Sequence, residues 1–105
     1  MNSITVKELK AKMDAGEPFK LIDVREEYEA EIATLGAELI PLADVLENAD
    51  KFKHDVPVIV HCRSGKRSAT AILQLEKQFG LKNLYNLEGG ILAWADEIDP
   101  NMDKY

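Results

Sequence analysis

The sequence predicts an α/β domain in which a mainly parallel β-sheet carries helices on its faces. Short apolar runs alternate with amphipathic segments along the chain, which is the pattern of consecutive strand and helix units. The strongest strand pattern, at residues 56–61, is followed directly by the strongest helix pattern, at 64–80. The 105 residues contain no internal repeat and no interdomain linker. We therefore expect a single domain that spans residues 1–105.

The first half of the chain is expected to contain three strands and three helical segments. Thr5 and Glu8 have the spacing of a capping box, and Gly16 follows the helix that they begin. In order, we expect a short strand at 3–6, a helix at 5–16, a strand at 19–24, a charged helical turn or short helix at 25–32, a short strand at 37–42 that Pro41 ends, and a helix at 42–50.

The second half carries the clearest signals. The strand at 56–61 is β-branched and continuously apolar, and its proline lies near the first position, where a missing N–H is tolerated. Gly80 stands where the C-terminal cap of the helix at 64–80 belongs. A last strand at 83–89 and a last helix at 89–98 follow, with Phe79 and Trp94 expected in the core. The tail at 99–105 is expected to fray.

Composition excludes several classes of protein. A net charge of −6 argues against a nucleic-acid surface, and a single cysteine excludes an intrachain disulfide framework and any multi-cysteine zinc site. The polar N-terminus lacks the apolar stretch of a secretory signal, and no apolar run is long enough to span a bilayer. A free thiol suits a reducing compartment, so we expect a soluble cytoplasmic protein without a membrane partner.

The single cysteine, Cys62, lies directly after the most buried-looking strand. Sites in open α/β sheets form beyond the carboxyl ends of strands, so this position favours a functional role. The charge around Cys62 differs from that of the rest of the chain. Residues 56–75 contain Arg63, Lys66 and Arg67 but no carboxylate.

A thiol at such a strand-to-helix turn faces helix N–H groups that have no intrahelical partner. These donors, together with the nearby cations, stabilise a thiolate and lower the pKa of the cysteine. Gly65 allows the backbone to curve around an anion, and the hydroxyls of Ser64 and Ser68 are further donors. A lone cysteine is commonly a buried small hydrophobic residue. Because that interpretation leaves the basic, glycine-centred turn unexplained, the residues favour a reactive thiol at Cys62.

Three stretches of the chain resemble the rhodanese-like sulfurtransferases in their single-domain form. The stretch "HCRSGKRS" (61–68) resembles their active-site loop, "LIDVRE" (21–26) their first signature and "LEGGILAW" (87–94) their closing signature. The resemblance implies a three-layer domain with a five-stranded, mainly parallel sheet and helices on both faces. The middle signature departs from the family pattern. Ala30 and Glu31 stand where glycine and histidine are usual, Leu39 where asparagine is, and an extra residue precedes Gly36, which leaves the geometry of residues 30–36 open.

Loop length separates two chemistries on this scaffold. Four residues lie between Cys62 and Arg67, whereas the related cell-cycle phosphatases and arsenate reductases carry five residues between their cysteine and arginine. The longer loop encloses a tetrahedral phosphate or arsenate, and the shorter one curls around a single sulfur atom. The count therefore favours a sulfurtransferase over a phosphatase or arsenate reductase.

The resemblance implies that the Cys62 thiolate takes a sulfane sulfur from thiosulfate or another persulfide donor and passes it to cyanide or to a thiol acceptor, such as a small thiol protein. N–H groups of the loop from Arg63 to Arg67 would hold that sulfur, and Arg63, Lys66 and Arg67 would attract the anionic donor. Neither a metal nor an organic cofactor is required. A non-enzymatic persulfide carrier or interaction module remains an alternative.

Three further features are interpreted without a direct part in the chemistry. By resemblance, Asp23 and Arg25 brace the active-site loop from the end of a neighbouring strand. His61 precedes Cys62 in a strand, where adjacent side chains point to opposite faces, so it is interpreted as structural. Glu26, Glu27, Glu29 and Glu31 are interpreted as the solvated face of a helix.

Overall fold

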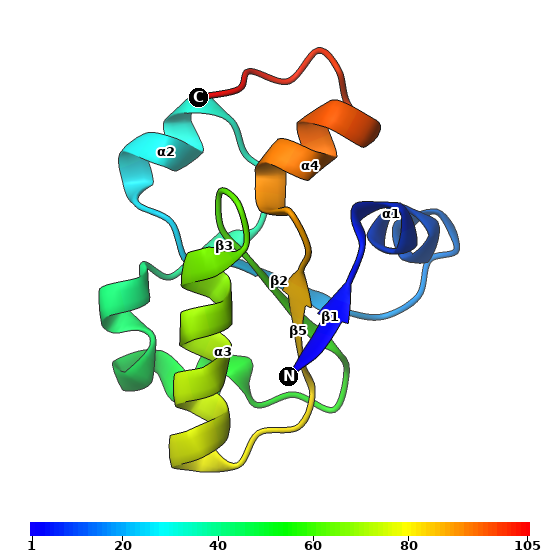
Figure 1. Ribbon diagram of the computed structural model, residues 1–105. Coiled ribbons are helices and arrows are strands. Elements are labelled where there is room, and N and C mark those ends of the chain that lie inside the picture. Colours follow the sequence, from blue (N-terminus) through cyan, green and yellow to red (C-terminus); the bar gives the residue numbers. More distant parts are fainter.

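The computed structural model describes all residues from 1 to 105 and contains one five-stranded parallel sheet (Figure 1). Its strand order is β1-β5-β4-β2-β3, and every neighbouring pair is parallel. The strands are β1 (Asn2–Ile4), β2 (Lys20–Asp23), β3 (Glu38–Leu39), β4 (Val58–His61) and β5 (Leu84–Leu87). The predicted α/β fold class with a parallel five-stranded sheet is thereby confirmed.

Helices fill the connections between the strands. They are α1 (Val6–Asp14), α2 (Glu27–Ile32), the 3₁₀ helices η1 (Leu42–Asp44) and η2 (Leu46–Phe52), α3 (Lys66–Phe79) and α4 (Gly90–Glu97). The single helix expected at 42–50 is wrong, because two 3₁₀ helices take its place. Asn48 has non-helical angles (φ −110°, ψ 27°), and its side-chain amide donates to the Asp44 carbonyl at 2.9 Å. Such side-chain bonds to nearby backbone compete with regular helix.

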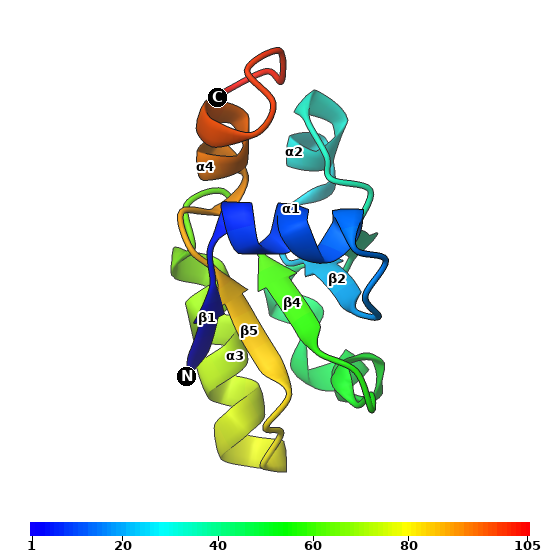
Figure 2. The ribbon, with the colours of Figure 1, turned by 90° about the vertical axis from the view of Figure 1, so that its right-hand side faces the viewer.

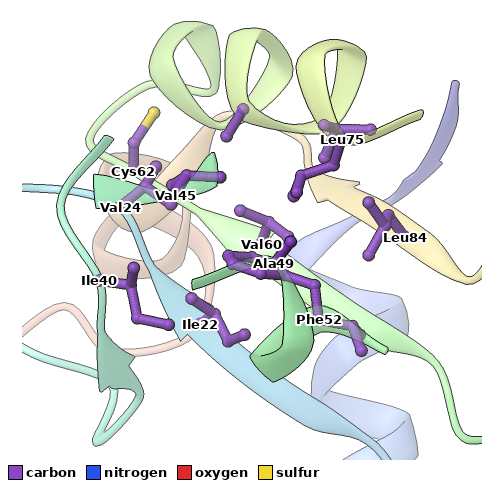
Figure 3. Packing of buried hydrophobic residues seen from close by; sticks show 13 residues of the cluster. Ile22, Val24, Ile40, Val45, Ala49, Phe52, Val60, Cys62, Leu75 and Leu84 are labelled. Atoms are coloured by element: carbon purple, nitrogen blue, oxygen red, sulfur yellow. The ribbon is translucent and has the colours of Figure 1, made fainter. Parts of the chain in front are cut away.

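Apolar side chains on the two faces of the sheet form two separate cores. Along β4, Val58 and Val60 face one side and Ile59 faces the other, as the alternation of a strand requires. The first core lies between one face of the sheet and the helices α3, η1 and η2 (Figure 3). The second lies under α1 and α4 and includes Trp94 (Figure 2). The domain therefore has three layers, and the predicted burial of Trp94 is confirmed.

The helix ends follow the local sequence, but one predicted core residue is exposed. Thr5 and Glu8 form the expected capping box, and Gly80 adopts the left-handed conformation (φ 65°) that ends α3. Phe79 was expected in the core but is 41% exposed. Helix α3, with 14 residues, is about 21 Å long, whereas the four-residue strand β4 is only about 13 Å. The end of the helix, with Phe79, therefore extends past the sheet.

The carboxyl ends of all five strands meet at one edge of the sheet, where α2, α4 and the β4–α3 turn lie (Figure 2). Cys62 begins that turn, directly after β4. Asp23 is aligned with His61 in the register of β2 with β4. None of the helices combines the length and the apolar character that a bilayer crossing requires.

Helix α4 begins against the backbone of the Cys62 turn. The N–H of Ile91 donates to the carbonyl of Cys62 at 3.1 Å, and the N–H of Leu92 donates to that of Arg63 at 3.2 Å. Gly90 has a φ of +59°, and a Cβ at this residue would lie 2.4 Å from the Arg63 oxygen and 2.7 Å from the Cys62 oxygen. Only glycine lets the helix approach the turn this closely.

We therefore expect Gly90→Ala to destabilise the domain more than a glycine substitution that meets no neighbouring atom. Gly80 is a matched control, because its φ is +65° and no atom lies within 4 Å of its would-be Cβ. Gly80→Ala should lower the free energy of unfolding by about 1 kcal/mol through backbone strain alone, and Gly90→Ala by about 1–3 kcal/mol more through the added clash. Urea unfolding measures both values. Equal losses in the two variants would contradict the close packing of α4 on the turn.

Candidate active site

The sulfur of Cys62 lies at the end of the first core, beside the start of α3 (Figure 3). The residue is 1% exposed, and its Sγ accepts a hydrogen bond from the Gly65 N–H at 3.1 Å. Burial, the largest single influence, raises the pKa of Cys62. Hydrogen bonds from the Ser68 hydroxyl and from the N–H groups of Ser68, Gly65 and Ser64 outweigh it and hold the pKa below its ordinary value. The environment of Cys62 therefore favours a thiolate.

Asn86 in β5 holds the turn and was not found from the sequence. Its side-chain N–H donates to the Gly65 carbonyl at 3.1 Å, and its Oδ1 lies 2.5 Å from the Ser68 hydroxyl. The available signal was a polar residue within an otherwise apolar strand. Gly65 itself has a φ of +105°, which turns the chain from β4 into α3. Asn86 thus fixes both the glycine of the turn and the serine beside the sulfur.

The Ser68 hydroxyl has two acceptors but only one hydrogen. Its oxygen lies 2.5 Å from Asn86 Oδ1 and 3.4 Å from Cys62 Sγ. In the thiol state the S–H can donate to Ser68 while Ser68 donates to Asn86. When Cys62 loses its proton, the hydroxyl can turn and donate to the sulfur. Ser68 can therefore respond to the charge on Cys62 without moving its backbone.

Arg67 forms a bidentate ion pair with Glu29 of α2. Its two terminal nitrogens donate to the two carboxylate oxygens at 2.7 and 2.8 Å. Glu29 is only 3% exposed, so its interpretation as part of a solvated helix face is wrong. The ion pair lowers the pKa of Glu29 to about 2 and raises that of Arg67. The sequence showed four similar glutamates but not that this one faces inward.

Asp23 and Arg25 form a second ion pair, which is buried. The Arg25 Nε lies 3.0 and 3.1 Å from the two Asp23 oxygens, and a terminal nitrogen lies 2.8 Å from one of them. Arg25 also donates to the carbonyls of Ala33, at 2.9 Å, and Glu29, at 3.4 Å. The pair thus contacts the end of α2, and it reaches the active-site loop through Glu29 and Arg67.

The irregular segment at 30–36 ends α2 and reverses the chain. Ala33 is extended (φ −158°, ψ 143°), which directs its carbonyl to Arg25. Gly36 has a φ of +77°, and its N–H donates to the Thr34 hydroxyl oxygen at 3.0 Å. The departures from the family pattern therefore fall in or next to a turn that is fixed by the hydrogen bond from Arg25 to Ala33 and by that from Gly36 to Thr34.

Arg63 and Lys66 are the predicted cations that remain at the rim. Both side chains are exposed, and neither forms an ion pair with a carboxylate. The Arg63 guanidinium lies 4.9 Å from the centre of the Tyr105 ring. Ser64 is exposed between them and offers its N–H to the sulfur. Of the three expected anion-attracting cations, two are unpaired and Arg67 is engaged by Glu29.

His61 contacts the backbone of Cys62 rather than its sulfur. Its Nδ1 lies 3.3 Å from the Cys62 carbonyl oxygen, and its Nε2 lies 3.8 Å from an Asp23 oxygen. Burial lowers the pKa of His61, which favours the neutral ring. This placement agrees with the structural interpretation and argues against a Cys–His catalytic pair.

Known proteins match this chain along nearly its whole length. The Rhodanese-like domain family matches residues 5–97. The chain belongs to the rhodanese-like domain family. Among its relatives, the putative sulfurtransferase YtwF of Bacillus subtilis is 38% identical over 101 residues, which cover 95% of this chain and 96% of YtwF. The probable adenylyltransferase/sulfurtransferase MoeZ of Mycobacterium tuberculosis is 37% identical over 107 residues, 99% of this chain but 27% of MoeZ.

Solved structures agree with that assignment. A rhodanese-like domain protein from Staphylococcus aureus superposes with a TM-score of 0.82 at 32% identity, covering 100% of this chain and 99% of the other. The protein SSP1007 from Staphylococcus saprophyticus gives a TM-score of 0.81 at 35% identity, covering 93% of this chain and 97% of the other. The rhodanese fold and membership of a sulfurtransferase family are therefore established, whereas the chain spans only about a quarter of MoeZ.

Cys62 lines none of the surface hollows of this rhodanese-like domain. The largest hollow of the surface, about 670 Å³, is lined by residues 53–55 and 80–83, before β4 and β5 begin. It therefore lies at the opposite end of these strands from Cys62. No three histidine, cysteine, aspartate or glutamate side chains gather to form a metal site. The chemistry available at the rim is that of the thiolate, the N–H groups and the two unpaired cations.

We expect Ser68→Ala to raise the pKa of Cys62 by about 0.5 to 1, because the thiolate loses one donor that contributes about 1 kcal/mol. Ser64→Ala is the matched control. It removes a hydroxyl from the same turn but keeps the N–H that points to the sulfur. Because Cys62 is the only cysteine, the ultraviolet absorbance of the thiolate during a pH titration reports its pKa directly. An unchanged pKa in Ser68→Ala would rule out the hydroxyl as a donor to the thiolate.

The Glu29–Arg67 pair predicts a stability change in acid. The pKa of Glu29 is about 2 in the folded protein, below its ordinary 4.5. Its stabilisation is therefore complete above about pH 5 and is lost as the pH falls towards 2. Glu29→Gln should lower the free energy of unfolding by about 1–3 kcal/mol at pH 7, and the difference from wild type should shrink below pH 5.

Urea unfolding of both proteins at several pH values measures that difference, and Glu27→Gln, on the exposed side of α2, is the control. A difference that stays constant from pH 7 to pH 3 would contradict the lowered pKa of Glu29.

Proposed function

We propose that this domain is a sulfurtransferase that takes a sulfane sulfur from thiosulfate or a persulfide donor and passes it to a thiol acceptor. The observation that carries the proposal is the surroundings of Cys62. Its sulfur accepts hydrogen bonds from N–H groups of the β4–α3 turn and of the start of α3, and two unpaired cations stand at the rim. The family, and relatives named as sulfurtransferases, support the same reaction class.

In the first step the Cys62 thiolate attacks the outer sulfur of thiosulfate. A bond forms between the two sulfurs as the sulfur–sulfur bond of thiosulfate breaks. Its electron pair leaves with sulfite, which thereby takes up the charge of the thiolate, and the transferred sulfur keeps the negative charge it had in thiosulfate as the terminal sulfur of the new persulfide. A persulfide donor reacts in the same way and releases a thiolate instead of sulfite. Charge and atoms balance in both cases without an added oxidant or reductant.

The loop would hold the persulfide through its N–H groups. Donors that are fixed before the reaction stabilise a charged product without a cost of reorganisation. The N–H groups of Ser64, Gly65 and Ser68 already surround the Cys62 sulfur. They remain close enough to stabilise the negative charge when it lies on the terminal sulfur of the persulfide, one atom beyond Cys62 Sγ. The same donors that lower the pKa of the thiolate therefore also stabilise the intermediate.

Arg63 and Lys66 would attract the doubly charged donor and help sulfite to leave. Both are exposed and unpaired, so their charges act on an approaching anion. Arg67 has a different part. Its guanidinium is held by Glu29, so it anchors the start of α3 to α2 and keeps the loop in shape.

In the second step an acceptor attacks the terminal sulfur and releases the Cys62 thiolate. The acceptor would be a cellular thiol, such as that of a small thiol protein, and cyanide can replace it in an assay. Thiol acceptors stay reduced in the cytosol, so we propose that this reaction takes place in the cytoplasm. The names of MoeZ and of MOCS3 from Drosophila yakuba, which is 32% identical over 97% of this chain, pair a sulfurtransferase with an adenylyltransferase. Because this chain spans only about a quarter of those proteins, their acceptors are not assigned to it.

The four residues between Cys62 and Arg67 argue against phosphate-ester or arsenate chemistry. A pure persulfide carrier differs from an enzyme only in turnover. Repeated release of thiocyanate from thiosulfate and cyanide identifies an enzyme, whereas one equivalent per chain identifies a carrier.

The proposal is tested by intact mass spectrometry after treatment with thiosulfate, or with a low-molecular-weight persulfide. Wild-type protein should gain the mass of one sulfur atom, because it has one thiolate in the cradle. Cyanide should remove that mass. The Cys62→Ala variant should gain nothing.

Two results would overturn the proposal. One is the absence of a mass gain with either donor in folded wild-type protein. The other is phosphate-ester hydrolysis that is lost in Cys62→Ser, without any sulfur transfer.

A further inference from the structure

Residues 99–105, which follow α4, cross above the Cys62 turn and end near α2. Figures 1 and 2 show this segment over the β4–α3 turn from two directions. Although the sequence indicated a frayed tail, contacts hold the segment at several of its residues. Met102 packs against the second core and its N–H donates to the Asp99 carbonyl at 3.1 Å, while Lys104 pairs with Asp96 of α4. We call residues 99–105 the strap.

Tyr105 fixes the far end of the strap to the two ion pairs of the site. Its hydroxyl accepts a hydrogen bond from Arg25 at 2.8 Å and donates to Glu29 Oε1 at 3.1 Å. Asp23, two backbone carbonyls and Tyr105 together give the Arg25 guanidinium a partner for each of its five N–H groups. The hydroxyl therefore fills the last free position in this network.

The ring of Tyr105 faces the loop. The guanidinium of Arg63, the residue after Cys62, lies over this ring at 4.9 Å, within the range of a cation–π contact. Arg63 is one of the two unpaired cations at the rim, and Cys62 below is 1% exposed. Tyr105 thus holds a rim residue in place beside a nearly covered sulfur.

We propose that Tyr105 is a specificity-determining residue that restricts by size what reaches Cys62. With its hydroxyl bound to Arg25 and Glu29, Tyr105 would narrow the approach to Cys62 so that only small anions such as thiosulfate pass. A bulky partner, such as a thiol carried on a folded protein, reaches the sulfur only after Tyr105 has left the rim. This assignment of substrates rests on the proposed sulfurtransferase function, whereas the restriction itself is a property of the fold.

The structure favours local opening of the strap. It contains turns but no helix or strand. Tyr105 is partly exposed, and only its hydroxyl and its ring make the contacts that hold it. Segments with few buried contacts open without unfolding of the domain. Opening removes no residue from the two cores except the partly buried Met102. The cradle of N–H groups around the sulfur would therefore persist in the open state.

Alkylation of Cys62 with two maleimides of different size tests the proposal. N-ethylmaleimide is small, and a maleimide on a long polyethylene glycol chain is bulky but has the same reactive group. Tyr105→Ala should raise the rate with the bulky reagent about tenfold or more and that with the small reagent about twofold or less, because it shifts the strap to its open state. Tyr105→Phe, which keeps the ring, should lie between wild type and Tyr105→Ala.

Tyr28→Ala is the matched control, since Tyr28 on α2 is exposed and makes no hydrogen bond through its side chain. It should leave both rates at the wild-type value. If the bulky reagent reacts equally fast with wild type and Tyr105→Ala, Tyr105 does not restrict access. If both reagents accelerate equally in Tyr105→Ala, the effect is on thiolate reactivity and the size restriction is refuted.

Sulfur loading separates this proposal from the proposed function. Thiosulfate should load Tyr105→Ala and wild type at rates within about twofold, because a small anion enters in both states. A large loss of loading in Tyr105→Ala would overturn the restriction by size, since Tyr105 would then help to bind thiosulfate. If neither protein takes up sulfur, the proposed function fails, while the alkylation rates still decide whether Tyr105 restricts access.

Discussion

The hydrogen bonds from the β4–α3 turn and the start of α3 to the sulfur of Cys62 are the interaction on which the site depends. Gly65 occupies the N-cap position of α3 but has no side chain to accept the unpaired N–H groups of that turn. The sulfur accepts one of them instead, that of Ser68 at the third helical position, together with the N–H groups of Ser64 and Gly65 that precede the helix. The nucleophile thus serves as the cap of its own helix. What stabilises the thiolate also fixes the start of α3.

This arrangement requires residues that fix the β4–α3 turn without pairing all of its cations with carboxylates. Asn86 grips the turn from β5, and the ion pair of Arg67 with Glu29 ties α3 to α2. Isolated buried ion pairs add little net stability, but a fully hydrogen-bonded pair can fix one geometry among several. Because Glu29 pairs with Arg67 alone, Arg63 and Lys66 have no carboxylate partner and can attract an incoming anion.

The sequence indicates those parts of the fold and the site that local patterns determine. The β-branched strand, the glycine turn and the cations lie within one stretch, so Cys62 and its loop could be predicted from the residues alone. Glu29 could not, because four similar glutamates lie in or directly before one short helix, and only the packing of that helix decides which of them faces inward. Tyr105 meets Arg25 across 80 positions of sequence, a contact that no local pattern encodes. The two 3₁₀ helices likewise depend on a side-chain bond that propensity does not reveal.

A nearly covered nucleophile presents a conflict, since burial alone would raise the pKa of the thiol and also hinder its partners. The N–H groups of the turn resolve the first half, because they more than offset the effect of burial on the pKa of Cys62. The second problem, the access of reaction partners to the sulfur, involves residues that do not touch the sulfur. Arg63 and Tyr105 belong to different parts of the chain and meet above the turn. Reactivity therefore depends on backbone that is built into the fold, whereas access depends on a segment that can change without disturbing it.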